Sequence, residues 1–213
     1  MIRMFKTNRF LKLLFPKYIW ELPNSEKKIY LTFDDGPIPE VTEWVLELLK
    51  KEEIKATFFC IGENIQKHPE VFKQIISENH TIGNHTFNHL KGWNTSTKKY
   101  LENVELCNLV FEKYSISNFQ SKLFRPPYGK ITPWQAYRLR KLDYKIIMWD
   151  VLSYDFDNSL NPDDCLQNTL KNTSNGSIIV FHDSIKARRN LQLVLPKLIQ
   201  QLKEKGFVFD KIN

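Results

Sequence analysis

The chain of 213 residues has little of several residue types that mark particular classes of protein. Its 7 glycines and 10 prolines are too few for a collagen-like or linker-type sequence. Its 3 cysteines, Cys60, Cys107 and Cys165, lie far apart, which argues against a disulfide framework and against a thiolate metal site. No apolar run approaches the roughly 18 residues that a membrane-spanning helix needs, so we expect a soluble or peripheral protein.

The residues that are abundant favour a folded protein with a large core. Hydrophobic residues make up 42% of the chain, aromatic residues 13% and charged residues 26%, a composition that excludes intrinsic disorder. The 31 Lys and Arg against 24 Asp and Glu give a net charge of +7, which nucleic acid, an anionic membrane or an acidic polymer could attract. No stripe of basic residues with interleaved aromatic residues is present, so we expect no nucleic-acid partner.

Residues 1–26 are predicted to be an N-terminal extension of a single domain that spans residues 1–213. Basic residues interrupt each apolar run of this segment, and no small-residue cleavage site follows, so no cleavable signal peptide is predicted. We favour packing of the extension on the domain, with peripheral contact between a basic amphipathic segment and a membrane as the alternative. The default expectation is a cytoplasmic or membrane-peripheral protein, and the sequence leaves its oligomeric state open.

Strand-like and helix-like segments alternate along the chain. The predicted strands are residues 28–33, 56–61, 81–84, 122–124, 144–149, 177–181 and 207–209. The predicted helices are residues 41–51, 69–79, 96–114, 133–141, 162–172 and 190–205. This alternation predicts an α/β fold with a mainly parallel sheet of seven strands and surrounding helices, either doubly wound or a (β/α) barrel.

Ionisable residues follow five of the predicted strands. Because the carboxyl ends of parallel strands lie on one face of an α/β fold, we expect these residues to share one rim. Each cluster alone has a structural explanation: adjacent acids often lie in a solvated turn, and a histidine after an apolar strand is often a core residue. Their coincidence on one rim favours a functional site. The clusters are Asp34 with Asp35, His85 with His89, Arg125, Asp150 with Asp155, and His182 with Asp183.

The spacing of His85 and His89 indicates a metal site. Residues at i and i+4 share one face of a helix, so both imidazoles could reach one ion, although such pairs are often accidental. Two imidazoles and one carboxylate suit a catalytic Zn²⁺ or a similar divalent ion. The glutamate of the H-E-x-x-H metalloproteases is missing, so Asp34, beside the candidate ligand Asp35, is the available general base.

At these residues the sequence resembles the polysaccharide deacetylases, which carry the NodB-homology domain and form carbohydrate esterase family four. The resemblance runs from about Lys27 to Phe209. Three motifs in the family's order carry it: Thr32–Pro37 (TFDDGP), His85–His89 (HTFNH) and Arg125–Gly129 (RPPYG).

The resemblance implies a distorted (β/α) barrel that removes N-acetyl groups from the amino sugars of a polysaccharide or oligosaccharide. It implies one divalent metal ion, with Zn²⁺ favoured over Co²⁺, Ni²⁺ or Mn²⁺, bound by Asp35, His85 and His89. The implied catalytic residues are Asp34 as general base, Arg125 as its partner, His182 as general acid, Asp155 as the residue that orients His182, and Tyr128, whose backbone N–H would hold the oxyanion. The side chains expected to contact the glycan are those of Pro126, Trp149 and Phe156.

Two further motifs depart from the family pattern. The fourth is usually Asp-x-x-Asp-Trp, whereas Leu152–Phe156 here keeps Asp155 but has Leu and Phe at the ends. The fifth is usually Leu-x-His and here is Val180–His182. Phe156 keeps a flat apolar surface but lacks an indole N–H, so these changes bear on the substrate more than on the reaction.

Competing interpretations remain at this point. Two histidines and a carboxylate also form the site of non-haem iron oxygenases, but such an enzyme would not use Asp34 or the Arg125 motif. A sugar-binding barrel with weak or no activity would need neither Asp34 nor His182. The glycan could be chitin-like, peptidoglycan or a surface polysaccharide. Such polymers lie outside the cytoplasm, although the sequence shows no clear export signal.

Overall fold

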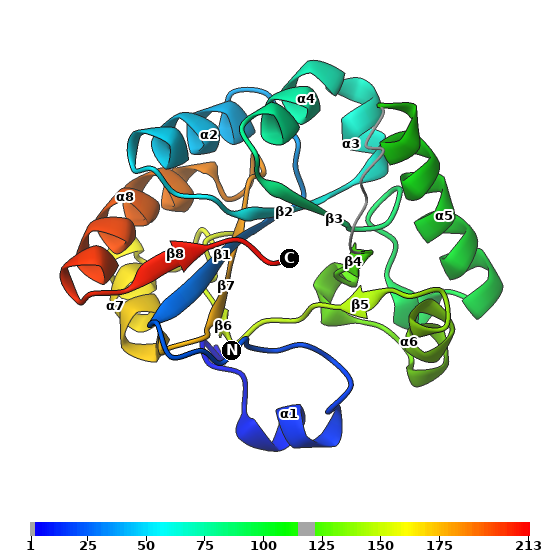
Figure 1. Cartoon of the computed structure of the whole chain (residues 1–213), viewed down its shortest axis with the longest axis horizontal. Helices are drawn as coiled ribbons and strands as arrows, with labels where there is room; N and C mark the ends of the chain where they lie inside the picture. The colour runs from blue at the N-terminus through cyan, green and yellow to red at the C-terminus, as the bar shows by residue number, and fades with distance from the viewer. Residues whose placement is uncertain (1–2, 115–121) are drawn as a thin grey trace.

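A computed structural model describes residues 3–114 and 122–213 and shows an α/β fold built on a parallel sheet that curls into a half-barrel (Figure 1). The strand order is β5-β4-β3-β2-β1-β7-β6, with β8 paired to the start of β1. The predicted fold class is therefore confirmed. The strands are β1 Lys28–Asp34, β2 Thr57–Cys60, β3 Thr81–Asn84, β4 Leu123–Phe124, β5 Lys145–Ile146, β6 Val151–Leu152, β7 Ile178–His182 and β8 Val208–Asp210.

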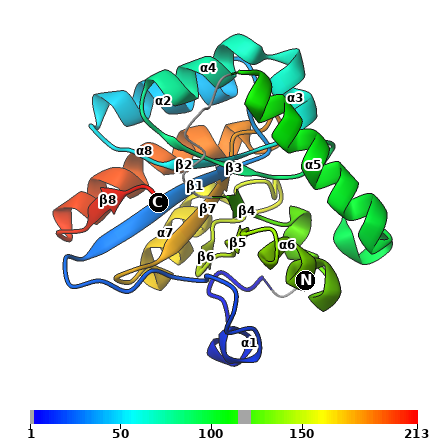
Figure 2. The ribbon, with the colours of Figure 1, turned by 45° about the vertical axis from the view of Figure 1, so that its right-hand side comes forward.

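Helices cover the outside of the sheet, and short α1 lies apart from them (Figure 2). They are α1 Arg9–Leu14, α2 Val41–Lys51, α3 Gly62–Lys67, α4 Pro69–Ser77, α5 Thr97–Lys113, α6 Pro133–Arg140, α7 Pro162–Asn172 and α8 Arg188–Glu204, with 3₁₀ turns η1 Gly92–Asn94 and η2 Pro127–Gly129. Proline at the first helical position and a capping side chain explain two starts: Thr132 caps α6, and Asn161 caps α7. Helices α1 and α3 were not predicted.

The two faces of β1 show how the sheet is packed. Leu31 and Phe33 are fully buried in the core shared with the outer helices. Thr32 and Asp34 alternate with them and face the inside of the half-barrel, as the period of two in a strand requires. The strand thus carries its polar residues into the interior, and its carboxyl end presents Asp34 at the rim.

One predicted strand is divided differently in the structure. The expected strand at 144–149 is only Lys145–Ile146 (β5), and β6 follows at Val151–Leu152, where no strand was predicted. Strand β5 pairs with β4 and strand β6 with β7, so β5 and β6 lie at opposite ends of the strand order. The apolar residues of this stretch do not show that β5 and β6 pair with different strands.

The described part of the N-terminal extension bridges the two ends of this strand order. Ile19 forms a parallel bridge with Ile147, next to β5, and Lys6 forms an antiparallel bridge with Val151 in β6. Buried Asp150 anchors the extension, because its carboxylate lies 2.6 Å from Lys6 Nζ and 2.5 Å from Lys12 Nζ. The predicted packing of the extension on the domain is therefore confirmed for residues from Arg3 onward.

Helix α1 has two apolar sides. Leu11, together with Phe15 just beyond the helix, packs against the core, whereas Phe10, Leu13 and Leu14 are 72%, 68% and 59% exposed.

Within the described ranges, no helix is both long and apolar enough to cross a membrane. The three cysteines are free and buried.

Candidate active site

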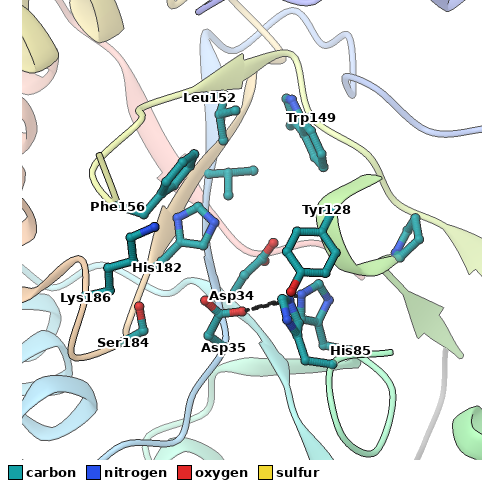
Figure 3. A pocket seen from close by; sticks show the side chains of 13 residues that line it. Asp34, Asp35, His85, Tyr128, Trp149, Leu152, Phe156, His182, Ser184 and Lys186 are labelled. Carbon is teal, nitrogen blue, oxygen red and sulfur yellow. Dashed lines mark ion pairs between the residues drawn. The ribbon is translucent and has the colours of Figure 1, made fainter. Parts of the chain in front are cut away.

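The predicted site residues converge on one cavity of about 510 Å³ at the carboxyl ends of the strands (Figure 3). Arg125 and Asp155 are the exceptions: both are fully buried behind its wall. Four residues that were not predicted as site residues complete the lining: Leu152, Val180, Ser184 and Lys186. The predicted residues in the lining are Asp34, Asp35, His85, His89, Pro126, Tyr128, Trp149, Phe156 and His182.

Asp34 is held in the cavity wall by a buried ion pair with Arg125. Arg125 Nη1 lies 2.7 Å from Asp34 Oδ1 and also donates to Thr32 Oγ1 at 2.7 Å. Burial by itself raises the pKa of Asp34, but the guanidinium beside it prevails and holds that pKa below its usual range. Asp34 is therefore ionised at neutral pH.

The remaining donors of Arg125 fix its position. Nη2 donates to the carbonyl of Met148 at 2.9 Å, and Nε to that of Ile147 at 3.3 Å. The guanidinium also stacks on Phe59, with 4.1 Å between its central carbon and the ring centroid. A buried cation with this many partners can keep Asp34 in one place and in one charge state.

Asp35, His85 and His89 lie together across the cavity from His182. Asp35 Oδ1 lies 3.3 Å from His89 Nε2 and 3.7 Å from His85 Nε2. The i, i+4 spacing indicated one face of a helix, but residues 85–89 form a loop with positive φ at Thr86 and His89. The loop turns the two rings toward one point, with 5.1 Å between their centroids.

These three residues fit a divalent transition-metal ion. One ligand atom from each lies within 4.8 Å of the others, and Asp35 Oδ1 is buried without a hydrogen-bond partner among the described residues. His85 Nδ1 faces the carbonyl of Arg125 at 2.8 Å, so it carries the proton and leaves Nε2 with a lone pair. Burial lowers the pKa of His85. Burial, and to a smaller extent repulsion from His85, lowers the pKa of His89 to about 4. Both imidazoles are neutral, as metal binding requires.

A second charged pair lies on the other side of the cavity. His182 Nδ1 lies 2.7 Å from Asp155 Oδ1, and the backbone N–H of His182 donates to Oδ2 at 2.7 Å. Burial lowers the pKa of His182, but the Asp155 carboxylate outweighs burial and raises it to about 9. Ser153 Oγ donates to Asp155 Oδ1 at 3.0 Å and steadies the acid. His182 is therefore a cation at neutral pH, with Nε2 available to the cavity.

Asp183 has a positioning role that the sequence analysis missed. Its carboxylate accepts hydrogen bonds from the backbone N–H of Gly36 at 3.0 Å and from Thr42 Oγ1 at 2.6 Å. A Cβ on Gly36 would lie 1.9 Å from Asp183 Oδ2, so only glycine lets the turn after Asp35 approach this acid. The only signal in the sequence was its place beside His182 at the end of a strand.

Apolar side chains form the walls around these polar groups. The Phe156 ring stands edge-on to His182 with 4.9 Å between centroids, and Lys186 Nζ lies 5.5 Å from the centroid of Phe156. Trp149 and Tyr128 line the opposite side (Figure 3). Leu152 offers no carboxylate, so this stretch of the wall is apolar.

Comparison with known proteins decides the family. The sequence pattern of the family described as polysaccharide deacetylase matches residues 21–147. The chain belongs to the polysaccharide deacetylase family. This deacetylase is 36% identical over 196 residues to a peptidoglycan-N-acetylglucosamine deacetylase of Bacillus cereus, in an alignment that covers 91% of this chain and 90% of the relative.

Solved structures share the fold. The peptidoglycan N-acetylglucosamine deacetylase Bc1960, in complex with 4-naphthalen-1-yl-N-oxidanyl-benzamide, aligns with a TM-score of 0.88 and 31% identity over 97% of this chain and 95% of its own. BA3943 of Bacillus anthracis, a CE4 family pseudoenzyme, aligns with a TM-score of 0.79 and 26% identity over 91% of this chain and 66% of its own.

As a member of this family, the protein is a hydrolase that removes acetyl groups from polysaccharides. A pseudoenzyme shares the fold, so the reacting groups must be identified among the side chains of this cavity. The ionised acid Asp34 and the protonated His182 line one cavity together with a triad suited to a metal. A barrel that only binds sugar has no use for this pair.

Proposed function

We propose that this deacetylase removes the acetyl group from N-acetylglucosamine units of peptidoglycan with the help of a bound Zn²⁺ ion. The relatives named above, whose substrate is peptidoglycan N-acetylglucosamine, support the substrate. One carboxylate and two neutral imidazoles suit Zn²⁺ better than a hard, oxygen-preferring ion. When bound by Asp35, His85 and His89, the ion would acidify water and polarise the acetyl carbonyl.

The observation that carries the mechanism is the pairing of an ionised acid and a protonated histidine in one cavity. Asp34 uses Oδ1 for Arg125, so its other carboxylate oxygen is the one that accepts the proton of the attacking water. His182, held by Asp155, donates a proton to the nitrogen that leaves, because an amine departs only when protonated. The backbone N–H of Tyr128, whose φ is 58°, is assigned to the developing oxyanion.

The cavity walls position the sugar. Pro126 and Trp149 on one side and Phe156 on the other are apolar surfaces for the faces of a sugar ring. Phe156 also shields the His182–Asp155 pair from water, which strengthens their interaction.

The test is acetate release from chitooligosaccharides and from purified peptidoglycan, using protein treated with chelator and then reloaded with Zn²⁺. Digestion of the treated peptidoglycan with a muramidase, followed by mass spectrometry, shows which sugar has lost its acetyl group. We expect loss from N-acetylglucosamine. Loss from the muramic acid alone would contradict the proposed substrate, and no acetate release from any glycan would contradict the proposed function.

We also propose that the exposed side of α1 makes peripheral contact with an anionic membrane. The side chains of Phe10, Leu13 and Leu14 point away from the core, and Arg9 and Lys17, both exposed, flank them. An apolar face beside basic residues is the pattern of an interfacial segment, in which burial of the face and attraction to anionic lipids act together.

Co-sedimentation with vesicles tests this contact. We expect the protein to bind vesicles that contain phosphatidylglycerol more than vesicles of phosphatidylcholine alone, and binding to weaken with salt. The double variant Phe10→Ser with Leu13→Ser should lose this binding. Leu109→Ser, on α5, changes a leucine that is 52% exposed elsewhere and serves as the control. Equal binding to both kinds of vesicle, or none, would contradict the proposal.

A further inference from the structure

The first described residues of the N-terminal extension lie along residues 150–157, which we call the acid loop because it carries the acid of the second charged pair. At the beginning of this loop, the backbone N–H of Leu152 donates to the carbonyl of Phe5 at 2.9 Å. At its end, Arg3 pairs with Asp157, with 2.7 Å between Nη2 and Oδ2. Strand β6 is the last in the strand order, and the extension bridges its second edge. The acid loop therefore depends on the extension for support on that side.

Tyr154 has a backbone conformation that needs support from other residues. Its φ is 60°, in the left-handed region, where a bulky side chain is rare and strained. Two residues of the extension hold it there. The backbone N–H of Met4 donates to the phenolic oxygen at 2.9 Å, and the Phe5 ring packs edge-on with 5.0 Å between centroids. The residue after this turn is Asp155, so the direction of its carboxylate depends on the conformation of Tyr154.

Aromatic contacts lead from Tyr154 to the proton donor. The ring centroids are 5.7 Å apart for Tyr154 and Phe156 and 4.9 Å apart for Phe156 and His182, which lie side by side in Figure 3. Asp155 lies between the two aromatic residues in the sequence, but its side chain is fully buried and faces His182 from behind the cavity wall. A shift of the Tyr154 ring would therefore move Phe156 and Asp155 together.

Asn190 in α8 holds the acid loop from the other side. Its Nδ2 donates to the carbonyl of Asp155 at 3.1 Å and to that of Asp157 at 3.2 Å. These two bonds fix the backbone of the loop, whereas the extension holds the Tyr154 side chain. The loop is thus held between a helix of the domain and the extension, and removal of one support should loosen it without unfolding the sheet.

Phe5 carries no charge, so its removal can change the electrostatics of His182 only through position. Phe5 also lies outside the lining of the reaction cavity, so an effect on the reaction has to pass through the acid loop. The titratable groups that face His182 belong to that loop and to the segments that follow β1, β3 and β7. They are Asp155, Asp34, Asp35, His89 and, across the Phe156 ring, Lys186.

We propose that Phe5 is a positioning residue for proton donation, because it holds the acid loop in the conformation that sets Asp155 against His182. The proposal rests on the proposed function, in which His182 protonates the nitrogen that leaves, and it adds a residue outside the cavity to that step. The N-terminal extension then helps to orient the proton donor, in addition to bridging the two ends of the strand order.

Steady-state acetate release from penta-N-acetylchitopentaose, with protein loaded with Zn²⁺, tests the proposal. Phe5→Ala should lower kcat roughly tenfold, which is a part of the 10²–10⁴-fold that a positioned proton donor contributes. KM should stay unchanged, because the residues that line the cavity are kept. The alkaline limb of kcat/KM should move to lower pH, because a displaced carboxylate stabilises the His182 cation less. Phe5→Leu, which keeps apolar bulk against Tyr154, should restore most of the lost kcat.

Phe207→Ala is the matched control. Like Phe5, Phe207 is a half-buried phenylalanine that packs against the main core cluster, but it precedes β8 beside the start of β1, at the end of the strands away from the cavity. Its variant should lose stability in urea to a similar extent and keep the kcat and the pH profile of the wild type. Tyr154→Phe removes the acceptor of the Met4 N–H and should lower kcat in the same direction as Phe5→Ala, to a smaller extent. It keeps the proposal testable if Phe5→Ala does not fold.

A double variant shows whether Phe5 acts through Asp155. In Asp155→Asn the charged pair is already broken, so the addition of Phe5→Ala should lower kcat little further. A further fall as large as the one that Phe5→Ala causes alone would overturn the proposal, as would an unchanged kcat in a folded Phe5→Ala protein. A rise in KM with kcat unchanged would assign the extension to substrate binding and would also overturn it.

A measurement that needs no turnover separates failure of this proposal from failure of the proposed function. If the wild type releases no acetate from any glycan, a pH titration of the His182 imidazole by NMR still reports its contact with Asp155. We expect the midpoint to lie at about pH 9 in the wild type and in Phe207→Ala, and at lower pH in Phe5→Ala. Equal midpoints in the wild type and Phe5→Ala would overturn the positioning role.

Discussion

Arg125 and Asp34 form an ion pair of 2.7 Å in which the Arg125 side chain is fully buried and that of Asp34 only 5% exposed. The pair connects the third motif of the sequence with the first, across 91 residues. Its guanidinium is satisfied by Thr32 and by two backbone carbonyls, so the desolvation cost of the charge is offset by several hydrogen bonds. Asp34 is thereby kept charged at the floor of a largely apolar cavity.

The first prediction removes the cation of this pair. Arg125→Met replaces the guanidinium by an apolar chain of similar length and leaves the Asp34 carboxylate buried without a counter-ion. Loss of one partner of a buried pair costs about 3–5 kcal/mol, so the free energy of unfolding should fall by that amount. Urea unfolding measures it. Arg138→Met, on the exposed side of α6, should change stability by less than about 0.5 kcal/mol. Equal effects of the two substitutions would show that the pair contributes nothing.

Much of this site could be predicted because parallel strands end at one rim. The polar residues that follow β1, β3, β4 and β7 were expected to meet there, and the cavity collects them. The alternation along β1 that sends Asp34 inward also follows from the period of a strand. These features depend on local pattern and on topology, both of which a single sequence records.

Other features depend on contacts between distant residues, which local pattern does not record. The anchoring of Lys6 on Asp150 joins residues 144 apart, and the bond from Gly36 to Asp183 joins residues 147 apart. Residues 85–89 form a loop that brings both imidazole rings close to Asp35, 50 or more residues earlier in the sequence. Nothing in the spacing of His85 and His89 distinguishes that loop from a helix.

The second prediction concerns metal removal. If Asp35, His85 and His89 bind Zn²⁺ only in the folded state, the ion stabilises that state by mass action, by about 2.7 kcal/mol at a hundredfold excess over Kd. Chelator-treated protein should therefore melt at a lower temperature than protein reloaded with Zn²⁺. In Asp35→Asn the gain should be smaller, because an anionic ligand is missing. An unchanged Tm on reloading the wild type, in a buffer free of competing ligands, would argue against the site.

The third prediction is a pH dependence set by His182. Its pKa is raised to about 9 in the folded state, from an ordinary value of 6.5, so the proton donor is present at neutral pH and is lost as pH rises through about 9. The value of kcat/KM should fall over that range. Because the folded pKa is the higher one, the stability that the His182–Asp155 pair adds is complete below pH 6.5 and is lost as pH rises from 6.5 to about 9.

Asp155→Asn tests this assignment. Without the carboxylate, burial of His182 is opposed only by the charges of Asp35 and Asp34, so the pKa of His182 falls and the alkaline limb of kcat/KM should move to lower pH. A pH profile for both proteins, with the urea midpoint at each pH, gives the two readouts. A limb that stays in place in the variant would show that another group donates the proton.

The last prediction distinguishes two neighbouring aspartates that a simple electrostatic account would treat alike. Asp34 is bound to Arg125, whereas Asp35 Oδ1 faces both imidazoles. Asp35→Asn removes an anionic ligand, so metal affinity and turnover should both fall. Asp34→Asn keeps the three ligands but cannot accept a proton, so turnover should fall by about 10²–10⁴-fold while the metal stays bound.

Metal titration by calorimetry and acetate release, for both variants in one buffer, decides between these roles. Asp34→Asn also leaves Arg125 without its partner, so a modest change in metal affinity is compatible with the assignment. Near-native turnover or loss of the metal in Asp34→Asn would show that it is not the base. An Asp35→Asn protein that keeps both metal and turnover would show that the ligand set is wrong. The two aspartates are adjacent in the sequence and chemically identical. A difference between the two variants in metal affinity and turnover can therefore come only from the partners that the fold gives each side chain.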